Sequence, residues 1–257
     1  VRFMREIFSF LAEYIDKNRI TLAAITGGGG KTSLLYGLGR ELAASRRVLL
    51  TTTTKIFRPA PGECRDLFVG PAKLCLSFLE AMPPASLLTA ASGEGGGKLL
   101  GYTTEETERL AGSGIAAVIA ECDGSRGRPL KFYEAWEPPV PQGCGCLFAV
   151  AGVGALGERA DEEQIFRADK FRVLHGIAEG AKVTAADYLS YLNHPEGPLK
   201  NAPRGAKKIL LLNQWETCGE DSRAALMGII PALLESYDAA ACVSMRRNIL
   251  YDYRERR

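Results

Sequence analysis

A run of glycines followed by a lysine and a threonine is the segment of this sequence best suited to chemistry. Glycine has no Cβ, so the N–H groups of such a run can wrap closely around a phosphate. A lysine placed next would neutralise the outer phosphates, and a threonine hydroxyl would bind Mg²⁺. The residues expected to hold the phosphates are Gly27, Gly28, Gly29, Gly30, Lys31, Thr32 and Ser33.

The spacing of this loop departs from the usual pattern. G-x-x-x-x-G-K-[ST] places a glycine at position 25, where this chain has Ile25. We therefore expect a loop that is shorter or bent differently, and the alternative is a glycine-rich turn with an accidental Gly-Lys-Thr. An apolar strand over 20–25 and a helix over 33–44 favour phosphate binding, because a helix that begins there points its N–H groups at the anion.

Two carboxylates follow a second apolar run. Residues 115–120 predict a buried strand that delivers Glu121 and Asp123, the form of a Walker B segment. We expect these carboxylates and Thr32 to hold Mg²⁺, or a carboxylate to orient an attacking water. Asp123 also suits a turn cap before Gly124.

Three cationic residues follow Asp123 in the sequence and are expected at the same edge of the sheet. Arg126, Arg128 and Lys131 suit a second anion or the transferred phosphate, and the alternative is a set of exposed loop charges. The predicted catalytic set is Lys31, Glu121, Asp123, Arg126 and Arg128.

Two further strand ends carry polar residues. At the end of a strand over 47–50, Thr52, Thr53 and Lys55 are expected to bind a metal water or a phosphate oxygen, although threonine also simply favours strands. Asn213, Gln214 and Glu216 follow a strand over 207–212 and are similar to the N-K-x-D guanine motif of GTPases. Glu216 would accept from guanine, and Asn213 would tie neighbouring loops together. ATP and GTP both remain candidates.

The elements that position these residues alternate in type. Apolar strand patterns at 20–25, 47–50, 67–69, 115–120, 146–151, 207–212 and 240–243 are interspersed with helical patterns. This order predicts an α/β protein, a P-loop NTPase-like three-layer sandwich with a mostly parallel sheet. We expect a single domain over 1–257, with an irregular and helical insertion over about 126–205. An amphipathic helix is expected within 4–15, and 91–97 is expected to be a surface loop.

Composition limits the partners. The 257 residues include 32 basic and 30 acidic residues, a net charge of +2, which argues against nucleic acid or an anionic membrane as the main partner. Arg246, Arg247, Arg254, Arg256 and Arg257 are interpreted as a solvated terminus. No apolar run is long enough to span a bilayer, and seven scattered cysteines suit a reducing compartment, so we expect a soluble cytoplasmic protein.

Several blocks taken together resemble a known family. The glycine loop 27–32, T-T-T-T-K-I-F at 51–57, D-G-S-R-G-R-P-L-K at 123–131, A-G-V and A-L-G at 151–157, and L-N-Q at 212–214 resemble the YqeC family of selenium-dependent hydroxylase accessory proteins. The resemblance covers about 20–245 and implies a P-loop NTPase-like fold and a role in maturing a molybdenum hydroxylase with labile selenium. That hydroxylase or its cofactor would be the partner. Cys122, Trp136, Phe166 and Ala168 depart from the family pattern.

Three functions remain open at this point. The first is a Mg²⁺-dependent nucleotide hydrolase or nucleotide-driven accessory factor. The second is a non-hydrolytic binding protein or chaperone for a phosphate-bearing molybdopterin-type cofactor. The third is a small-molecule kinase, which would need a separate acceptor.

Overall fold

Strands and helices alternate along the chain, as the apolar patterns predict. The structure is a computed structural model that describes residues 5–60 and 62–256. The α-helices are α1 Ile7–Lys17, α2 Lys31–Ala43, α3 Ala72–Ala81, α4 Thr104–Gly112, α5 Ala168–His175, α6 Ala185–Asn193 and α7 Glu220–Leu233. Single 3-10 turns are η1 Val153–Ala155 and η2 Trp215–Thr217. The strands are β1 Leu22–Gly27, β2 Arg47–Thr52, β3 Lys55–Phe57, β4 Asp66–Val69, β5 Ser86–Ala91, β6 Gly93–Gly95, β7 Lys98–Leu100, β8 Ala117–Glu121, β9 Leu130–Lys131, β10 Cys146–Gly152, β11 Ile165–Phe166, β12 Lys207–Asn213, β13 Ala239–Ser244 and β14 Ile249–Glu255.

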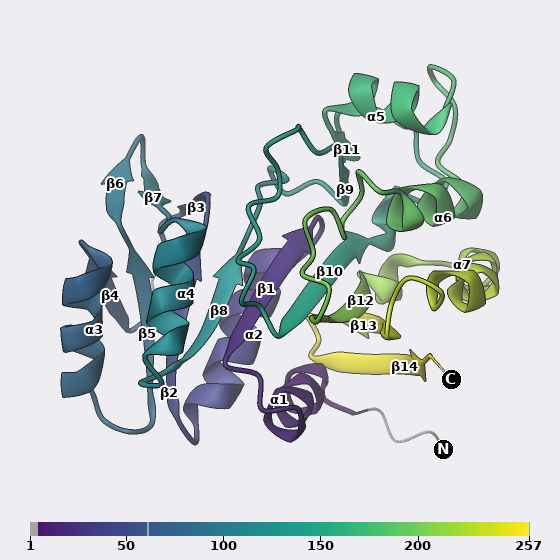
Figure 1. Cartoon of the computed structure of the whole chain (residues 1–257). Coiled ribbons are helices and arrows are strands. Elements are labelled where there is room, and N and C mark those ends of the chain that lie inside the picture. The colour runs from purple at the N-terminus through teal and green to yellow at the C-terminus, as the bar shows by residue number, and fades with distance from the viewer. Residues whose placement is uncertain (1–4, 61, 257) are drawn as a thin grey trace.

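A large central sheet organises the molecule (Figure 1). Among the described residues nine strands form it, in the order β14-β13-β12-β10-β1-β8-β2-β5-β4. Every neighbouring pair is parallel except β13 with β14. The strand before the glycine loop, β1, lies between β8 and β10, so the ends of β8 and β10 lie beside that loop.

Helices cover both faces of this sheet because the side chains of each strand alternate between two apolar cores. Ala23 and Ile25 face a core shared with α1 and α2. Leu22 and Ala24 face the opposite core, which α3 and α4 complete. A third core under α6 and α7 covers β10 and β12 on that same opposite side. The predicted α/β architecture with a mostly parallel sheet and helices on both faces is confirmed.

The patterns did not predict β5, an inner strand of the central sheet between β2 and β4, or the short strands β3, β9 and β11. Two further segments expected to be irregular also form strands. The C-terminal residues, expected to be a solvated terminus, instead form β14, which pairs antiparallel with β13. The last strand of the sheet in the sequence is therefore β14 and not the strand expected at 240–243. The side chains of Arg246, Arg247, Arg254 and Arg256 are nevertheless exposed, and Arg257 lies outside the described residues. The expected surface loop at 91–97 contains β6 and the turn into β7, and these strands pair with each other and with β3 in a small sheet.

Within the described part of the chain, no helix combines the length and the apolarity needed to cross a bilayer.

Candidate functional site

The loop between β1 and α2 is packed so tightly that its glycines are required by the backbone alone. A Cβ on Gly27 would lie 1.9 Å from the carbonyl oxygen of Val150. At Gly28 it would lie 2.5 Å from the Arg128 oxygen, and at Gly29 2.6 Å from the Gly152 Cα. Gly27, Gly28 and Gly29 are themselves buried. Part of the glycine run therefore serves close approach to neighbouring backbone, whatever the loop binds.

We expect Gly27→Ala to lower the free energy of unfolding by about 3 kcal/mol, because the new methyl would collide with a fixed carbonyl and Gly27 has a φ of 104°. Denaturant unfolding measures the loss. Gly124→Ala is the matched control, since its methyl would meet nothing within 4 Å. Equal effects of the two substitutions would contradict this account of the loop.

The first turn of α2, rather than the whole glycine run, faces an open pocket. The N-cap residue of α2 is Gly30, so no N-cap side chain accepts from the first N–H groups of the helix, and the first turn holds no acidic residue. The first N–H groups of a helix have no intrahelical partner, so they remain available to an anion. The pocket has a volume of about 300 Å³ and is lined by Gly30, Lys31, Thr32, Ser33, Lys55, Ile56, Phe57, Lys98, Glu121, Gly124, Ser125, Arg126 and Gly127.

Lys31 folds back over the loop from which it comes. Its ammonium donates to the Gly27 oxygen at 2.7 Å and to the Ser125 hydroxyl at 3.3 Å. It also lies 3.4 Å from Asp123 Oδ1 and 3.7 Å from Glu121 Oε1, and the residue is only 4% exposed. The two predicted carboxylates thus both face the charge of this lysine.

Glu121 and Thr32 meet at the pocket. The Thr32 hydroxyl donates to Glu121 Oε2 at 3.1 Å, joining the start of α2 to the end of β8. Burial raises the pKa of Glu121 above its ordinary value, with the charge of Asp123 adding to the rise and Lys31 and Thr32 acting against it. Both side chains offer oxygen atoms, the ligand type that Mg²⁺ prefers. No group of three or more His, Cys, Asp or Glu in the described residues is arranged to hold a metal.

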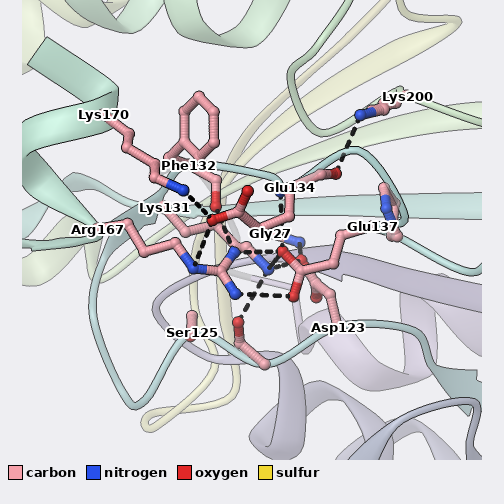
Figure 2. A network of polar contacts seen from close by, with 12 residues as sticks. Gly27, Asp123, Ser125, Lys131, Phe132, Glu134, Glu137, Arg167, Lys170 and Lys200 are labelled. Atoms are coloured by element: carbon pink, nitrogen blue, oxygen red, sulfur yellow. Dashed lines mark hydrogen bonds and ion pairs between the residues drawn. The ribbon is translucent and has the colours of Figure 1, made fainter. Parts of the chain in front are cut away.

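Asp123 is fully buried beneath the loop and is not part of the pocket lining. Its Oδ2 accepts from the Gly27 N–H at 3.2 Å and lies 3.2 Å from the Lys131 ammonium (Figure 2). Its Oδ1 accepts no hydrogen bond from the described residues and faces only the charge of Lys31. The structure therefore separates the two predicted metal ligands: Glu121 lies at the pocket, and Asp123 bridges two lysines below it.

Lys131 is also fully buried, so it does not line the pocket as a free cation. It donates to the Gly124 oxygen at 2.9 Å and lies 3.4 Å from Glu137 Oε2, and its ammonium lies 4.5 Å from the Tyr133 ring centroid. A carboxylate on each side satisfies this charge.

The ionic network continues to a residue that the sequence reasoning missed. Arg167, at the start of α5, binds Glu137 through both of its terminal nitrogens and lies 3.6 Å from Glu134 (Figure 2). Burial alone would raise the pKa of Glu137, but the Arg167 hydrogen bond and the Lys131 charge outweigh it, and the pKa lies below its ordinary value. Arg167 and Glu137 lie 30 residues apart, so only the fold brings them together.

The two arginines of the 126–128 segment have different surroundings. Arg126 is exposed and lines the pocket, with its guanidinium 5.0 Å from the Phe166 ring, whose centroid also lies 4.6 Å from Arg167. Arg128 instead donates to the backbone oxygen of Glu162 at 2.5 Å and does not line the pocket.

The threonines after β2 are engaged with neighbouring backbone. The Thr52 hydroxyl donates to the backbone oxygen of Glu121 at 2.7 Å, and the Thr53 hydroxyl donates to the backbone oxygen of Pro139 at 2.8 Å. Neither lines the pocket, whereas Lys55 does. Lys98 of β7 lines the pocket as well and was missed, because it comes just after the glycine-rich stretch expected to be a loop.

The residues after β12 divide between two places. Asn213 donates to the Gly29 oxygen at 2.7 Å and accepts from the Met245 N–H at 2.9 Å, so it ties the glycine loop to the end of β13. Gln214 lines a different pocket of about 390 Å³, alongside Gly154 and Thr217. Glu216 lines neither pocket, and its Oε2 is buried without a hydrogen-bond partner among the described residues.

Comparisons with known proteins agree with the sequence blocks. The family described as YqeC protein matches residues 23–169. The chain is similar to the uncharacterized protein YqeC of Escherichia coli (strain K12), at 36% identity over 224 residues that cover 84% of this chain and 85% of that protein. No solved structure matches the chain.

Proposed function

Since this chain belongs to the YqeC family, we propose from the geometry of its pocket that it is an accessory protein that binds a nucleoside triphosphate and hydrolyses it with Mg²⁺. The observation that carries the proposal is the hydrogen bond between Thr32 and Glu121 at the open N-terminus of α2. An anion site and a pair of metal-binding oxygens are thereby joined in one pocket.

Each side chain then has a distinct task. Lys31 and the N–H groups at the start of α2 would bind the outer phosphates, and Thr32 with Glu121 would hold Mg²⁺, which neutralises phosphate charge when bound. Lys31 reaches a phosphate by exchanging its bonds to Gly27 and Ser125 for the ligand. Arg126, exposed at the same pocket, would stabilise charge that develops on the transferred group.

ATP and GTP are both proposed ligands, and the base is left unassigned, since Asn213, Gln214 and Glu216, the base contacts expected from the sequence, do not line the pocket of Lys31 and Thr32. The proposed client is a selenium-dependent molybdenum hydroxylase or its cofactor, and this part rests on the sequence resemblance alone.

Calorimetric titration of the protein with ATP, GTP and a non-hydrolysable analogue, each with Mg²⁺ and with EDTA, tests the proposal. We expect saturable binding that Mg²⁺ strengthens, and phosphate release from the hydrolysable nucleotides without an added acceptor. A preference for one nucleotide would show that the protein distinguishes the base. Absence of binding by every nucleotide would refute the proposed function.

The metal part has its own test. Thr32→Val keeps the shape of the side chain and removes the hydroxyl, so we expect nucleotide affinity in Mg²⁺ to fall about tenfold, or about 1.4 kcal/mol. Thr32→Ser restores a hydroxyl and should restore the affinity. In EDTA the wild type and both variants should bind alike. A Thr32→Val protein with the full effect of Mg²⁺ would contradict the assignment.

A further inference from the structure

The pocket holds two lysines, Lys55 and Lys98, that the proposed nucleotide site does not use. Lys55, Lys98 and Arg126 all line it, and none of the three forms an ion pair with another described residue. Lys31, by contrast, already faces two carboxylates, and Glu121 is the only acidic side chain among the residues that line the pocket. Three uncompensated cations at one concave surface favour an anionic ligand.

The small sheet fixes two of these cations on one face. Phe57 of β3 pairs with Lys98 of β7, and Lys55 lies two residues before Phe57, so all three side chains project to the same side. Ile56 and Leu99, which alternate with them, are buried in the core. Lys55 and Lys98 are diagonal neighbours, about 7–8 Å apart in such a sheet.

No carboxylate of the small sheet offsets this pair. Glu94 of β6 pairs with Leu99, which places it on the other face, and its carboxylate binds Arg58 at 2.6 Å. The ammonium of Lys98 lies 4.5 Å from the ring centroid of Phe57, a side chain that is 72% exposed. The ring holds Lys98 at the pocket while leaving its charge free to meet a ligand.

The two lysines come from other segments than the proposed nucleotide contacts. The N–H groups of α2, Lys31, Thr32 and Glu121 belong to the main sheet and its first crossover helix, whereas Lys55 and Lys98 belong to the small sheet. The helix terminus, Lys31 and Mg²⁺ would together offset much of the charge of a triphosphate. The remaining cations are therefore available to a second anion.

We propose that Lys55 and Lys98, with Arg126 between them and the terminal phosphate of the nucleotide, form a second-anion subsite, which binds a small co-substrate carrying a phosphate or a carboxylate group. Lysine supplies point charges and arginine a bidentate fork, both suited to an anion with two or more oxygens. This inference rests on the proposed function, since the nucleotide defines the neighbouring half of the pocket.

The test is a calorimetric titration of the protein, saturated with a non-hydrolysable nucleotide and Mg²⁺, with inorganic phosphate in one arm and malonate in the other. We expect saturable binding in at least one arm, and the arm that responds identifies the anion class. Lys98→Gln should weaken that binding at least tenfold and leave nucleotide affinity within about twofold of the wild type. Lys55→Gln should weaken the anion likewise, and Lys73→Gln, an exposed lysine on α3, is the matched control.

The outcomes separate this inference from the proposed function. Nucleotide binding with no response to either anion would overturn the second subsite and leave the nucleotide site standing. A Lys98→Gln protein that loses nucleotide affinity tenfold would assign the cation to the nucleotide itself and also overturn the subsite. A wild-type protein that binds no nucleotide would refute the proposed function, and with it the premise of this inference.

Discussion

Lys31→Ala is expected to lower the affinity for ATP and GTP about a hundredfold, equivalent to about 2.7 kcal/mol. Lys31 is the first residue of α2 and lines the pocket. Its ammonium donates hydrogen bonds to Gly27 and Ser125. A phosphate would take over those bonds as charge-assisted contacts, which alanine cannot make. Calorimetric titration in Mg²⁺ measures the change.

A loss of affinity counts only if the variant is folded. Lys31→Ala also removes a charge from beside two carboxylates, so its thermal unfolding must be recorded alongside binding. Lys73→Ala, far along the chain on α3 and exposed, should bind nucleotide as the wild type does. A folded Lys31→Ala protein with wild-type affinity would show that the glycine loop does not hold the phosphates.

Lys131→Met should lower the free energy of unfolding by about 3 kcal/mol, because it removes one of the two cations that face the fully buried Asp123 and one of the two that face Glu137. The ammonium of Lys131 is the only group that faces Asp123 and Glu137 together among the described residues. Denaturant unfolding at neutral pH measures the loss. A second substitution, Asp123→Asn, should recover part of it by removing a buried carboxylate whose remaining cation is Lys31.

The matched control for this network is Lys170→Met. Lys170 pairs with Glu134 at the outer end of the same network, but its side chain is 57% exposed, so we expect less than about 1 kcal/mol. If Lys131→Met cost no more than Lys170→Met, the buried charges would not stabilise the fold, and Lys131 would be free to serve a ligand.

Most of the central sheet was predictable because its strands are buried on both faces. The run at 209–212, for example, is continuously apolar and buried, and it predicts the strand β12. The edge strand β14 was not predictable in this way, since its sequence I-L-Y-D-Y-R-E mixes charged and aromatic residues and only Leu250 is buried. Strands of three residues, as in β3, β6 and β7, are too short to show a period.

The candidate site was predictable only in its local parts. The glycine loop and the two carboxylates follow from neighbouring residues, but the different positions of Glu121 and Asp123 depend on how the chain turns after β8. The burial of Lys131 and the role of Arg167 depend on contacts between distant segments, which no local pattern encodes. Lys98 escaped notice for the same reason, because only the pairing of β7 with β3 brings it to the pocket.

The hydrogen bond from Asn213 to the Gly29 oxygen can form only after the chain has been synthesised as far as the end of β12. The two residues are 184 positions apart, and Asn213 is itself held by the N–H of Met245. Chains begin to fold from the N-terminus while the ribosome still extends them. A nascent chain that stops short of β12 therefore lacks the hydrogen bond from Asn213 to the glycine loop. Nucleotide binding would thus distinguish finished molecules from partial ones, and a bound nucleotide would protect the finished molecules from unfolding.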